Sequence, residues 1–154
     1  MWKRLLGRIV PPATGAAPRA KGRSAAHIEL PFIHIAEVDD AAPLAGELFL
    51  RKFKHPIPDY PRHFIAFHLA ADGARGVAAY VHYLPHDNVY LCGGMCVDAG
   101  LYRRLSAGEL SQLRAAGSLD AYLLRKTFDM VGPCAAIFGG VGDATARNVD
   151  LRAG

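Results

Sequence analysis

The sequence predicts an α/β protein with one mixed sheet, in which an antiparallel three-stranded meander precedes a parallel strand–helix–strand unit. Three segments rich in β-branched and aromatic residues, 63–70, 76–84 and 89–97, are joined by short polar links, which is the pattern of antiparallel hairpins. Residues 118–132 have helical periodicity and separate the last of these strands from an apolar run at 134–140. A strand, a helix and a strand in this order favour a right-handed parallel crossover.

The first two elements are expected to be a strand and a helix. Residues 28–38 predict a strand, and because Pro31 cannot donate to a ladder, we expect it at a sheet edge or a bulge. Residues 39–53 predict a helix, since Asp39 and Asp40 can cap it. Its core-facing stripe is expected to consist of Leu44, Leu48 and Phe49.

The second meander strand is expected at the centre of the sheet. Residues 77–84 are apolar on both faces of a strand. A strand of this kind is buried on both sides, so we expect helices to cover both faces of the sheet.

Two helices are expected after the meander. Ser106 and Glu109 have the spacing of a capping box, which starts a helix that Gly117 can end in a left-handed conformation. Ser118 can cap the helix that follows. The core face of that helix is expected to comprise Ala121, Leu124, Phe128 and Val131.

The end of the chain predicts one more strand and one more helix. Gly132 and Pro133 stop the preceding helix. The apolar run 134–140 predicts a short, fully buried strand, and 143–154 predicts a final helix. Residues 28–154 are therefore expected to form a single domain.

Residues 1–27 predict a disordered basic tail. The chain of 154 residues has a net charge of +4, but residues 1–28 hold six basic and no acidic side chains, so the remainder is net negative. Proline, alanine and glycine dominate 11–26. We interpret the segment as a solvated tail without membrane contact. The alternative is that its charge attracts an anionic membrane surface or a nucleic acid.

Hydropathy and cysteine usage favour a cytoplasmic protein. No stretch reaches the roughly 18 apolar residues of a membrane span. The apolar run near the start is broken by Arg8 and lacks a clear cleavage site, so we expect no secretory signal. Three cysteines, Cys92, Cys96 and Cys134, are an odd and low number, which is typical of reduced thiols.

The stretch YLCGGMCVDAG, residues 90–100, contains a strand that two glycines interrupt. Glycine weakens a strand and usually marks a bulge or the close approach of another group to the backbone. Gly93 and Gly94 therefore indicate either a bulge that a ligand approaches or an ordinary bend.

This order of elements, with these residues, resembles the GNAT acyltransferase superfamily over residues 28–154. Members of that family bind acetyl-CoA or another acyl-CoA between a bulged fourth strand and the fifth strand. Their pyrophosphate loop has the pattern Q/R-x-x-G-x-G/A, which RAAGSL, residues 114–119, fits except at Leu119. The resemblance implies an acyl-CoA-dependent N-acyltransferase that transfers an acyl group, acetyl in the first instance, to a small-molecule or peptide amine.

The resemblance also extends to the C-terminal motif N-x-x-A-x-x-φ-Y, in which φ is apolar. Asp143, Ala146 and Val149 take the first three places, and Asp150 stands where the family often has a tyrosine that acts as a general acid. The chain ends before the last two strands of the family, so we expect either a C-terminally incomplete domain or a homodimer that completes the sheet.

The resemblance implies a set of site residues. The backbone amides of Cys96 and Val97 would polarise the thioester carbonyl. Asp98 would act as the base toward the amine, whereas a turn-capping role is the alternative reading of this residue. The cofactor phosphates would meet the helix entrance and nearby cations, comprising Arg103, Arg104, Arg114, Ala115, Ala116, Gly117 and Ser118.

Other site classes find less support in the sequence. The cysteine spacing is not C-x-x-C and no further ligand pair completes a tetrad, so we expect no metal site. The segment 106–131 resembles a helix-turn-helix, but it offers only Arg125 and Lys126 on its second helix, so we expect no specific nucleic-acid binding. The alternative to an enzyme is a non-catalytic domain of the same fold that binds an acyl-CoA or a protein.

Overall fold

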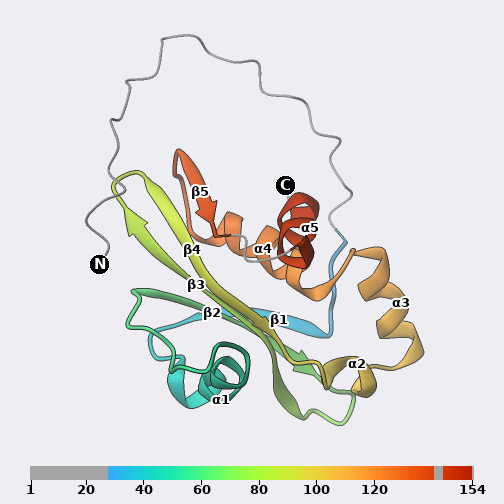
Figure 1. The fold of residues 1–154 in the computed structure, drawn as a ribbon. Helices are drawn as coiled ribbons and strands as arrows, with labels where there is room; N and C mark the ends of the chain where they lie inside the picture. Colours follow the sequence, from blue (N-terminus) through green and yellow to red (C-terminus); the bar gives the residue numbers. More distant parts are fainter. Residues whose placement is uncertain (1–27, 141–143, 154) are drawn as a thin grey trace, which may run out of the picture.

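The computed structural model describes residues 28–140 and 144–153, and within them a single five-stranded sheet carries helices on both faces (Figure 1). The strands lie in the order β1-β2-β3-β4-β5. The first four pair in antiparallel fashion, and β5 pairs with β4 in parallel. The predicted α/β class, meander and parallel unit are confirmed. The strands are β1 (Ile33–Val38), β2 (Arg62–Leu69), β3 (Arg75–His86), β4 (Val89–Val97) and β5 (Ala136–Gly139), and the helices are α1 (Ala42–Phe53), α2 (Leu101–Arg104), α3 (Ala107–Ala115), α4 (Leu119–Met130) and α5 (Ala144–Ala153).

The central strand β3 is covered on both faces, as predicted. Helix α1 lies on one face of the sheet, whereas α4 and α5 lie together on the other (Figure 1). Tyr80 of β3 is fully buried in the cluster below α1, where it meets the ring of Phe49 edge-on. Tyr83 is fully buried in the cluster below α4, where its hydroxyl and that of Thr127 are 2.7 Å apart.

Several local predictions are confirmed, because each depends on residues that are close together in the sequence. Strand β1 follows Pro31 and lies at a sheet edge. Ser106 and Glu109 form the expected capping box at the start of α3. Gly117 has a φ of +101°, the left-handed conformation expected after α3. The predicted tail, residues 1–27, lies outside the described residues.

Two burial predictions are wrong. Leu44 is 48% exposed because α1 packs instead through Ala41, Ala45, Leu48 and Phe49. Strand β5 was expected to be fully buried, but Phe138 is 57% exposed, since β5 lies at the edge of the sheet rather than inside it. The short helix α2 was not predicted at all.

A bulge interrupts β4 at its two glycines. Val81 of β3 lies opposite Met95, and Tyr83 lies opposite Cys92, so His82 faces two residues, Gly93 and Gly94. A β-carbon added at Gly93 would lie 2.0 Å from His82 Nε2, and one added at Gly94 would lie 2.7 Å from the ring of Phe49. The groups that approach this backbone are therefore two of the protein's own rings.

The ring of His82 also supplies a hydrogen bond to the bulge. The Gly94 N–H donates to His82 Nε2 at 3.1 Å. His82 Nδ1 lies 3.1 Å from the Tyr80 hydroxyl, which lies 2.8 Å from His63 Nδ1. Since Nε2 accepts from a backbone amide, the neutral tautomer of His82 carries its proton on Nδ1 and donates to Tyr80.

A single arginine fixes α4 to the sheet. Arg62 of β2 donates to both carboxylate oxygens of Glu37, at 2.6 and 2.8 Å. The same guanidinium donates to the carbonyls of Met130 and Val131 at the end of α4, and to the Tyr90 hydroxyl at 3.0 Å. The hydrogen bond with Glu37 is the first cause that raises the pKa of Arg62, so the guanidinium remains charged at any pH of interest.

We predict that Gly93→Ala lowers the free energy of unfolding by about 1–3 kcal/mol, the usual cost of overpacking a filled interior. The added methyl group collides with a His82 ring that is only 2% exposed. Gly76→Ala, on β3, is the matched control because nothing lies within 4 Å of its new β-carbon. Urea unfolding measures both changes, and equal midpoints for the two variants would contradict the account.

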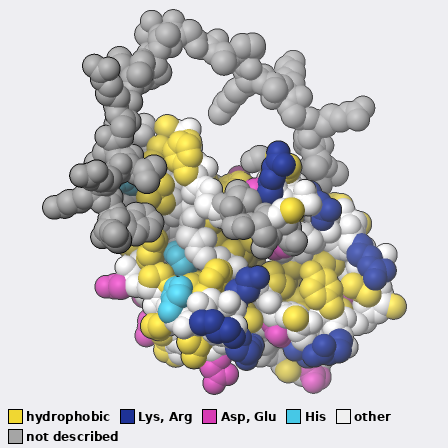
Figure 2. Space-filling view, in the orientation of Figure 1, with side chains coloured by type: hydrophobic (Ala, Val, Ile, Leu, Met, Phe, Trp, Pro, Cys, Tyr) yellow, Lys and Arg dark blue, Asp and Glu magenta, His cyan; other side chains and the backbone are white. Residues whose placement is uncertain are grey.

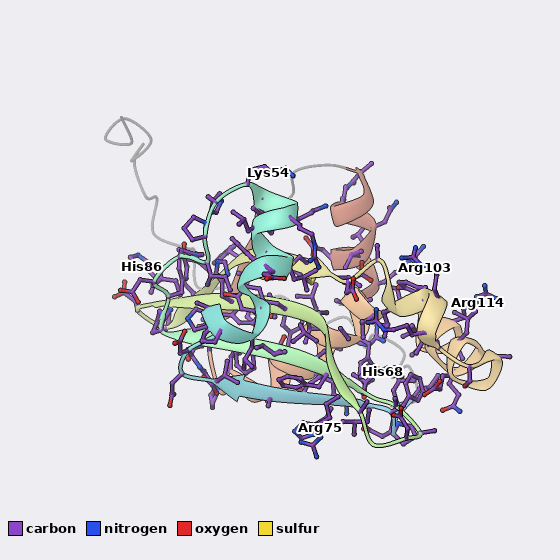
Figure 3. All side chains as sticks on the ribbon, turned by 90° about the horizontal axis from the view of Figure 1, so that it is seen from below. Lys54, His68, Arg75, His86, Arg103 and Arg114 are labelled. Atoms are coloured by element: carbon purple, nitrogen blue, oxygen red, sulfur yellow. The ribbon has the colours of Figure 1, made fainter. Side chains whose placement is uncertain are left out.

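We also predict that Arg62→Lys lowers the free energy of unfolding by about 2 kcal/mol, because a single ammonium cannot serve a carboxylate and two helix carbonyls together. Arg75→Lys is the control, since this exposed side chain points away from the body of the protein (Figure 3). We expect that exchange to change stability by less than about 0.5 kcal/mol. Thermal and urea unfolding of both variants check the difference, and a similar loss in each would refute it.

Candidate functional site

A gap opens between the parallel strands β4 and β5 at the position of the bulge. The two strands pair only from Val89 opposite Ala136 to Cys92 opposite Gly139. Residues 93–97 of β4 continue along β3, but no described strand lies on their other side, where β5 has ended. A cavity of about 510 Å³ lies along this part of β4.

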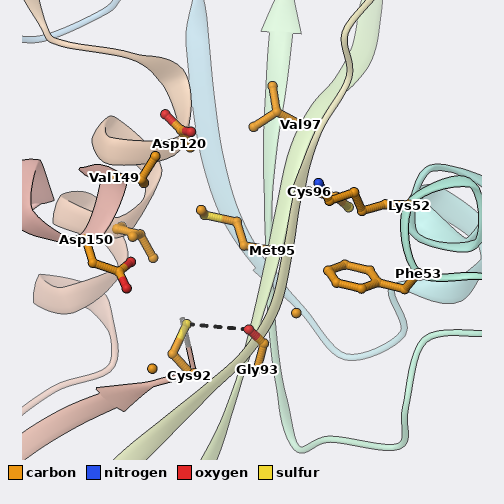
Figure 4. Close-up of a pocket in the computed structure, with 14 residues that line it drawn as sticks. Lys52, Phe53, Cys92, Gly93, Met95, Cys96, Val97, Asp120, Val149 and Asp150 are labelled. Atoms are coloured by element: carbon orange, nitrogen blue, oxygen red, sulfur yellow. Dashed lines mark hydrogen bonds between the residues drawn. The ribbon is translucent and has the colours of Figure 1, made fainter. Parts of the chain in front are cut away.

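The two walls of the cavity differ in chemistry. On the side of α4 and α5, the wall contains apolar side chains, which include Met95 and Val149, and the carboxylates of Asp120 and Asp150 (Figure 4). On the side of α1, the wall is formed by Lys52, Phe53 and Cys96. The ammonium of Lys52 extends from α1 toward β4 (Figure 4), and no ion pair to it is present among residues 28–140 and 144–153.

Both thiols of the cavity remain protonated. The bulge directs Cys92 to the α4 side and Cys96 to the α1 side, although residues four positions apart on a regular strand share a face. Burial raises the pKa of each thiol to about 12, and the Asp150 carboxylate adds to the effect on Cys92. A thiol with such a pKa is a poor nucleophile at neutral pH, so the cavity is not suited to a covalent thioester intermediate on the protein.

Asp150 of α5 is part of the cavity wall. Its Oδ2 lies 3.8 Å from the position that a β-carbon on Gly139 would take. Burial raises the pKa of this carboxyl above its ordinary value. Its charge also contributes to the raised pKa values of Cys92 and Tyr83, so the three groups lie close together. Helix α5 carries Asp150, and the alignment on the family motif had marked the position.

Asp98, predicted as the base, lies in a turn and is not part of the cavity wall. Its carboxylate accepts from the Gly100 N–H at 3.1 Å and from Arg104 at 2.8 Å. Burial opposes ionisation of Asp98, but these hydrogen bonds outweigh it and hold the pKa below its usual value. This geometry corresponds to the alternative reading of Asp98, a turn-capping carboxylate. The ion pair with Asp98 also engages Arg104, which was predicted as a phosphate ligand.

The predicted phosphate loop, residues 114–118, is bonded within the protein. The amides of Ala116 and Gly117 donate to Gln112 and Arg114 carbonyls at 3.0 and 3.1 Å, and so close the end of α3. At the start of α4, Ser118 donates to Asp120, which accepts from the Ala121 N–H at 2.9 Å. These donors therefore already have partners, and a carboxylate stands where a phosphate was expected.

Arg103 and Arg114 are the predicted phosphate ligands whose guanidinium groups have no ion pair among the described residues. Both lie at the α2–α3 end of the molecule (Figure 3). Lys and Arg side chains occur over α1 and over this end, with hydrophobic side chains between them (Figure 2). Of the predicted site residues, the cavity wall contains only Cys96 and Val97.

Lys52 and Asp120 also line the cavity, but nothing in the sequence distinguishes them as site residues. Lys52 looked like a solvent-facing position of an amphipathic helix, and Asp120 looked like a helix-start carboxylate. Neither reading is wrong, since Lys52 is exposed and Asp120 accepts from the Ala121 amide. Their place beside β4 depends on how α1 and α4 pack on the sheet, which no local pattern expresses.

Comparison with known proteins does not assign a family. No protein-family model matches this chain, and neither the curated proteins nor the solved structures include a significant match. Among the described residues, no helix combines the length and apolar character that crossing a bilayer requires.

Proposed function

We propose that this chain binds an acyl-CoA in the gap between β4 and β5 and transfers the acyl group to an amine. One observation carries the proposal. A parallel strand pair separates at a bulge, which leaves the edge of residues 93–97 along a cavity of about 510 Å³. The same element order and bulged fourth strand underlie the resemblance to the GNAT acyltransferases.

The open edge of β4 suits the pantetheine arm of coenzyme A. An exposed strand edge offers rows of N–H and C=O groups, and an extended ligand with amides can add to it as a strand does. Pantetheine carries two amide groups on a narrow apolar chain. The apolar wall of Met95, Leu124 and Val149 fits such a chain, and a site of this kind combines apolar surface with a few placed polar groups.

The cavity favours direct transfer from the thioester to the amine. The amine attacks the thioester carbonyl, the C–N bond forms, the C–S bond breaks, and the coenzyme A thiolate leaves. Because the thiols of Cys92 and Cys96 stay protonated, no acyl-cysteine step is included. The backbone N–H of Val97 stabilises the developing oxyanion, because alternation along β4 turns it toward the gap, whereas the N–H of Cys96, like that of Asp98, faces β3.

Asp150 supplies a proton to the leaving thiolate in this proposal. Its carboxyl lines the cavity, and burial keeps its pKa above the ordinary value, so a larger fraction is protonated near neutral pH. The proton that the attacking amine loses to solvent balances the one that the thiolate gains. The carboxyl of Asp150 is then reprotonated from water.

The phosphates of the cofactor are assigned to the α2–α3 end. The start of α4 is filled by Asp120, which would repel a pyrophosphate. Arg103 and Arg114 have no ion-pair partner among residues 28–140 and 144–153 and lie near that end. Guanidinium groups bind phosphates with charge-assisted hydrogen bonds.

A non-catalytic binding domain is the second candidate. The ion pair with Arg104 and the lowered pKa make Asp98 a weak base. A protein that binds acyl-CoA without such a base would act as a sensor or an interaction module. Binding without turnover across an amine panel would favour this candidate.

Titration calorimetry with coenzyme A, acetyl-CoA and pantetheine tests the binding proposal. We expect binding of all three, and a combined Arg103→Ala and Arg114→Ala variant should lose about tenfold in affinity for coenzyme A while pantetheine binding stays unchanged, because pantetheine lacks the phosphates. Arg75→Ala is the matched control for charge. No binding of coenzyme A or acetyl-CoA at millimolar concentration would overturn the proposal.

We predict that Asp150→Asn separates turnover from stability. Turnover in a thiol-release assay should fall about 100-fold, the lower range for loss of a general acid. The raised pKa means that ionised Asp150 disfavours the folded state above that pKa, so the neutral amide should keep or raise the melting temperature at pH 7. Unchanged turnover, or a parallel loss of turnover and stability, would remove Asp150 from the mechanism.

A further inference from the structure

We propose that His82 is a positioning residue of the site, because its neutral imidazole accepts the Gly94 N–H and so holds β4 in the bulged shape that opens the gap. Ligand binding in the gap then requires neutral His82. The inference deepens the proposed function and rests on it for the identity of the ligand, whereas the control of the bulge stands on the geometry of β3 and β4.

The ring of His82 fills the inner side of the bulge. It sits opposite both Gly93 and Gly94, close enough to exclude any side chain at Gly93. The ring centroids of Tyr60 and Phe49 lie 4.4 and 5.8 Å from its own. Only 2% of His82 is exposed, so the ring has little room to move away from the backbone that it supports.

The hydrogen bond makes this support depend on the state of the ring. A bulge leaves a backbone group without a ladder partner, and here the Gly94 N–H finds one in Nε2 at 3.1 Å. A protonated imidazole carries hydrogen on both nitrogens and cannot accept. Protonation of His82 therefore places two N–H groups against each other at the point where β4 leaves β5.

The surroundings of His82 favour its neutral form. The ring of His82 is faced by His63 of β2 and by Tyr80 of its own strand. Tyr60 and His55 approach it from the loop after α1. Cys96 of β4 lies in the same cluster as Tyr80. Helix α1 adds the cations Arg51 and Lys52, whose charges act on Cys96. None of these groups is a carboxylate that would stabilise an imidazolium.

The direction of the pH effect follows from this environment. Burial first, and then the charges of His63 and His55, lower the pKa of His82 from 6.5 to about 4. The folded-state pKa is below the unfolded value, so the contribution to stability is fully present above about pH 6.5. It is lost as the pH falls toward 4, because the unfolded chain binds the proton more readily.

Two substitutions at His82 distinguish the effect of the hydrogen-bond acceptor from the effect of the imidazole ring itself. In His82→Gln, the side-chain amide oxygen can accept from Gly94 at every pH, whereas His82→Leu has no acceptor. Both proteins are compared with the wild type by circular dichroism, by coenzyme A titration at pH 7.5 and half a pH unit below the midpoint of the Gly94 transition, and by the NMR signals of Gly94 and Met95 over the pH range that spans this transition. His34→Gln, on the opposite edge strand β1, is the matched control.

We expect the Gly94 amide of the wild type to show a scalar coupling to His82 Nε2 that disappears with a midpoint near pH 4, while His82→Gln shows no such transition. At pH 7.5, His82→Leu should bind coenzyme A about tenfold more weakly than His82→Gln, the usual consequence of a lost buried acceptor. Half a pH unit below the midpoint, wild-type affinity should fall about fourfold relative to His82→Gln, since one quarter of the protein is competent.

The outcomes distinguish this inference from the proposed function. Absence of coenzyme A binding in every protein, together with the expected Gly94 transition, would overturn the ligand assignment and leave the control of the bulge standing. A Gly94 transition that persists in His82→Gln, or equal affinities for His82→Gln and His82→Leu, would overturn the role of His82. Should His82→Leu fail to fold, the Gly94 signals of the wild type and His82→Gln still decide the question.

Discussion

The hydrogen bond from the Gly94 N–H to His82 Nε2 is the contact on which the rest of the site depends. It ties an interrupted strand to a buried ring, and the interruption is the point at which β4 and β5 stop pairing. Two glycines are required because His82 and Phe49 occupy the space that side chains would need. The gap, the cavity and the separation of Cys92 from Cys96 onto opposite faces all follow from this one irregularity.

The protein combines a well-packed sheet with a bulge in β4 that ends the pairing with β5. Buried rings on both faces of β3 and the guanidinium of Arg62 at the end of α4 fix the neighbours of the gap. At the bulge, the Gly94 N–H has a hydrogen-bond partner in His82 Nε2. Among the described residues, no buried side-chain nitrogen or oxygen lacks a hydrogen-bond partner. Irregular strands of this kind occur often beside binding sites, where they redirect side chains and end pairing.

Local signals predicted most of the fold, since capping boxes, prolines, turns and strand composition act over a few residues. The order of elements and the edge position of β1 could therefore be read from the sequence, whereas Gly93 and Gly94 indicated either a bulge or an ordinary bend, and the structure shows the bulge. The exposure of β5 and of Leu44 could not be predicted from the sequence, because both depend on which elements lie beside them. The site was harder still, since Lys52, Asp120 and Asp150 come together only after three helices pack on one sheet. Arg104 was predicted as a phosphate ligand, because the sequence does not show that its guanidinium forms an ion pair with Asp98.

We propose that an extended thioester ligand lies along residues 93–97 of β4. Mapping of backbone amide shifts on addition of acetyl-CoA tests this most directly, because it reports where the ligand binds whether or not turnover occurs. The account predicts that the largest changes fall on Met95, Cys96 and Val97 and on Gly139 across the gap, with little change on β1. Changes confined to β1 and β2, or none at saturating ligand, would contradict it.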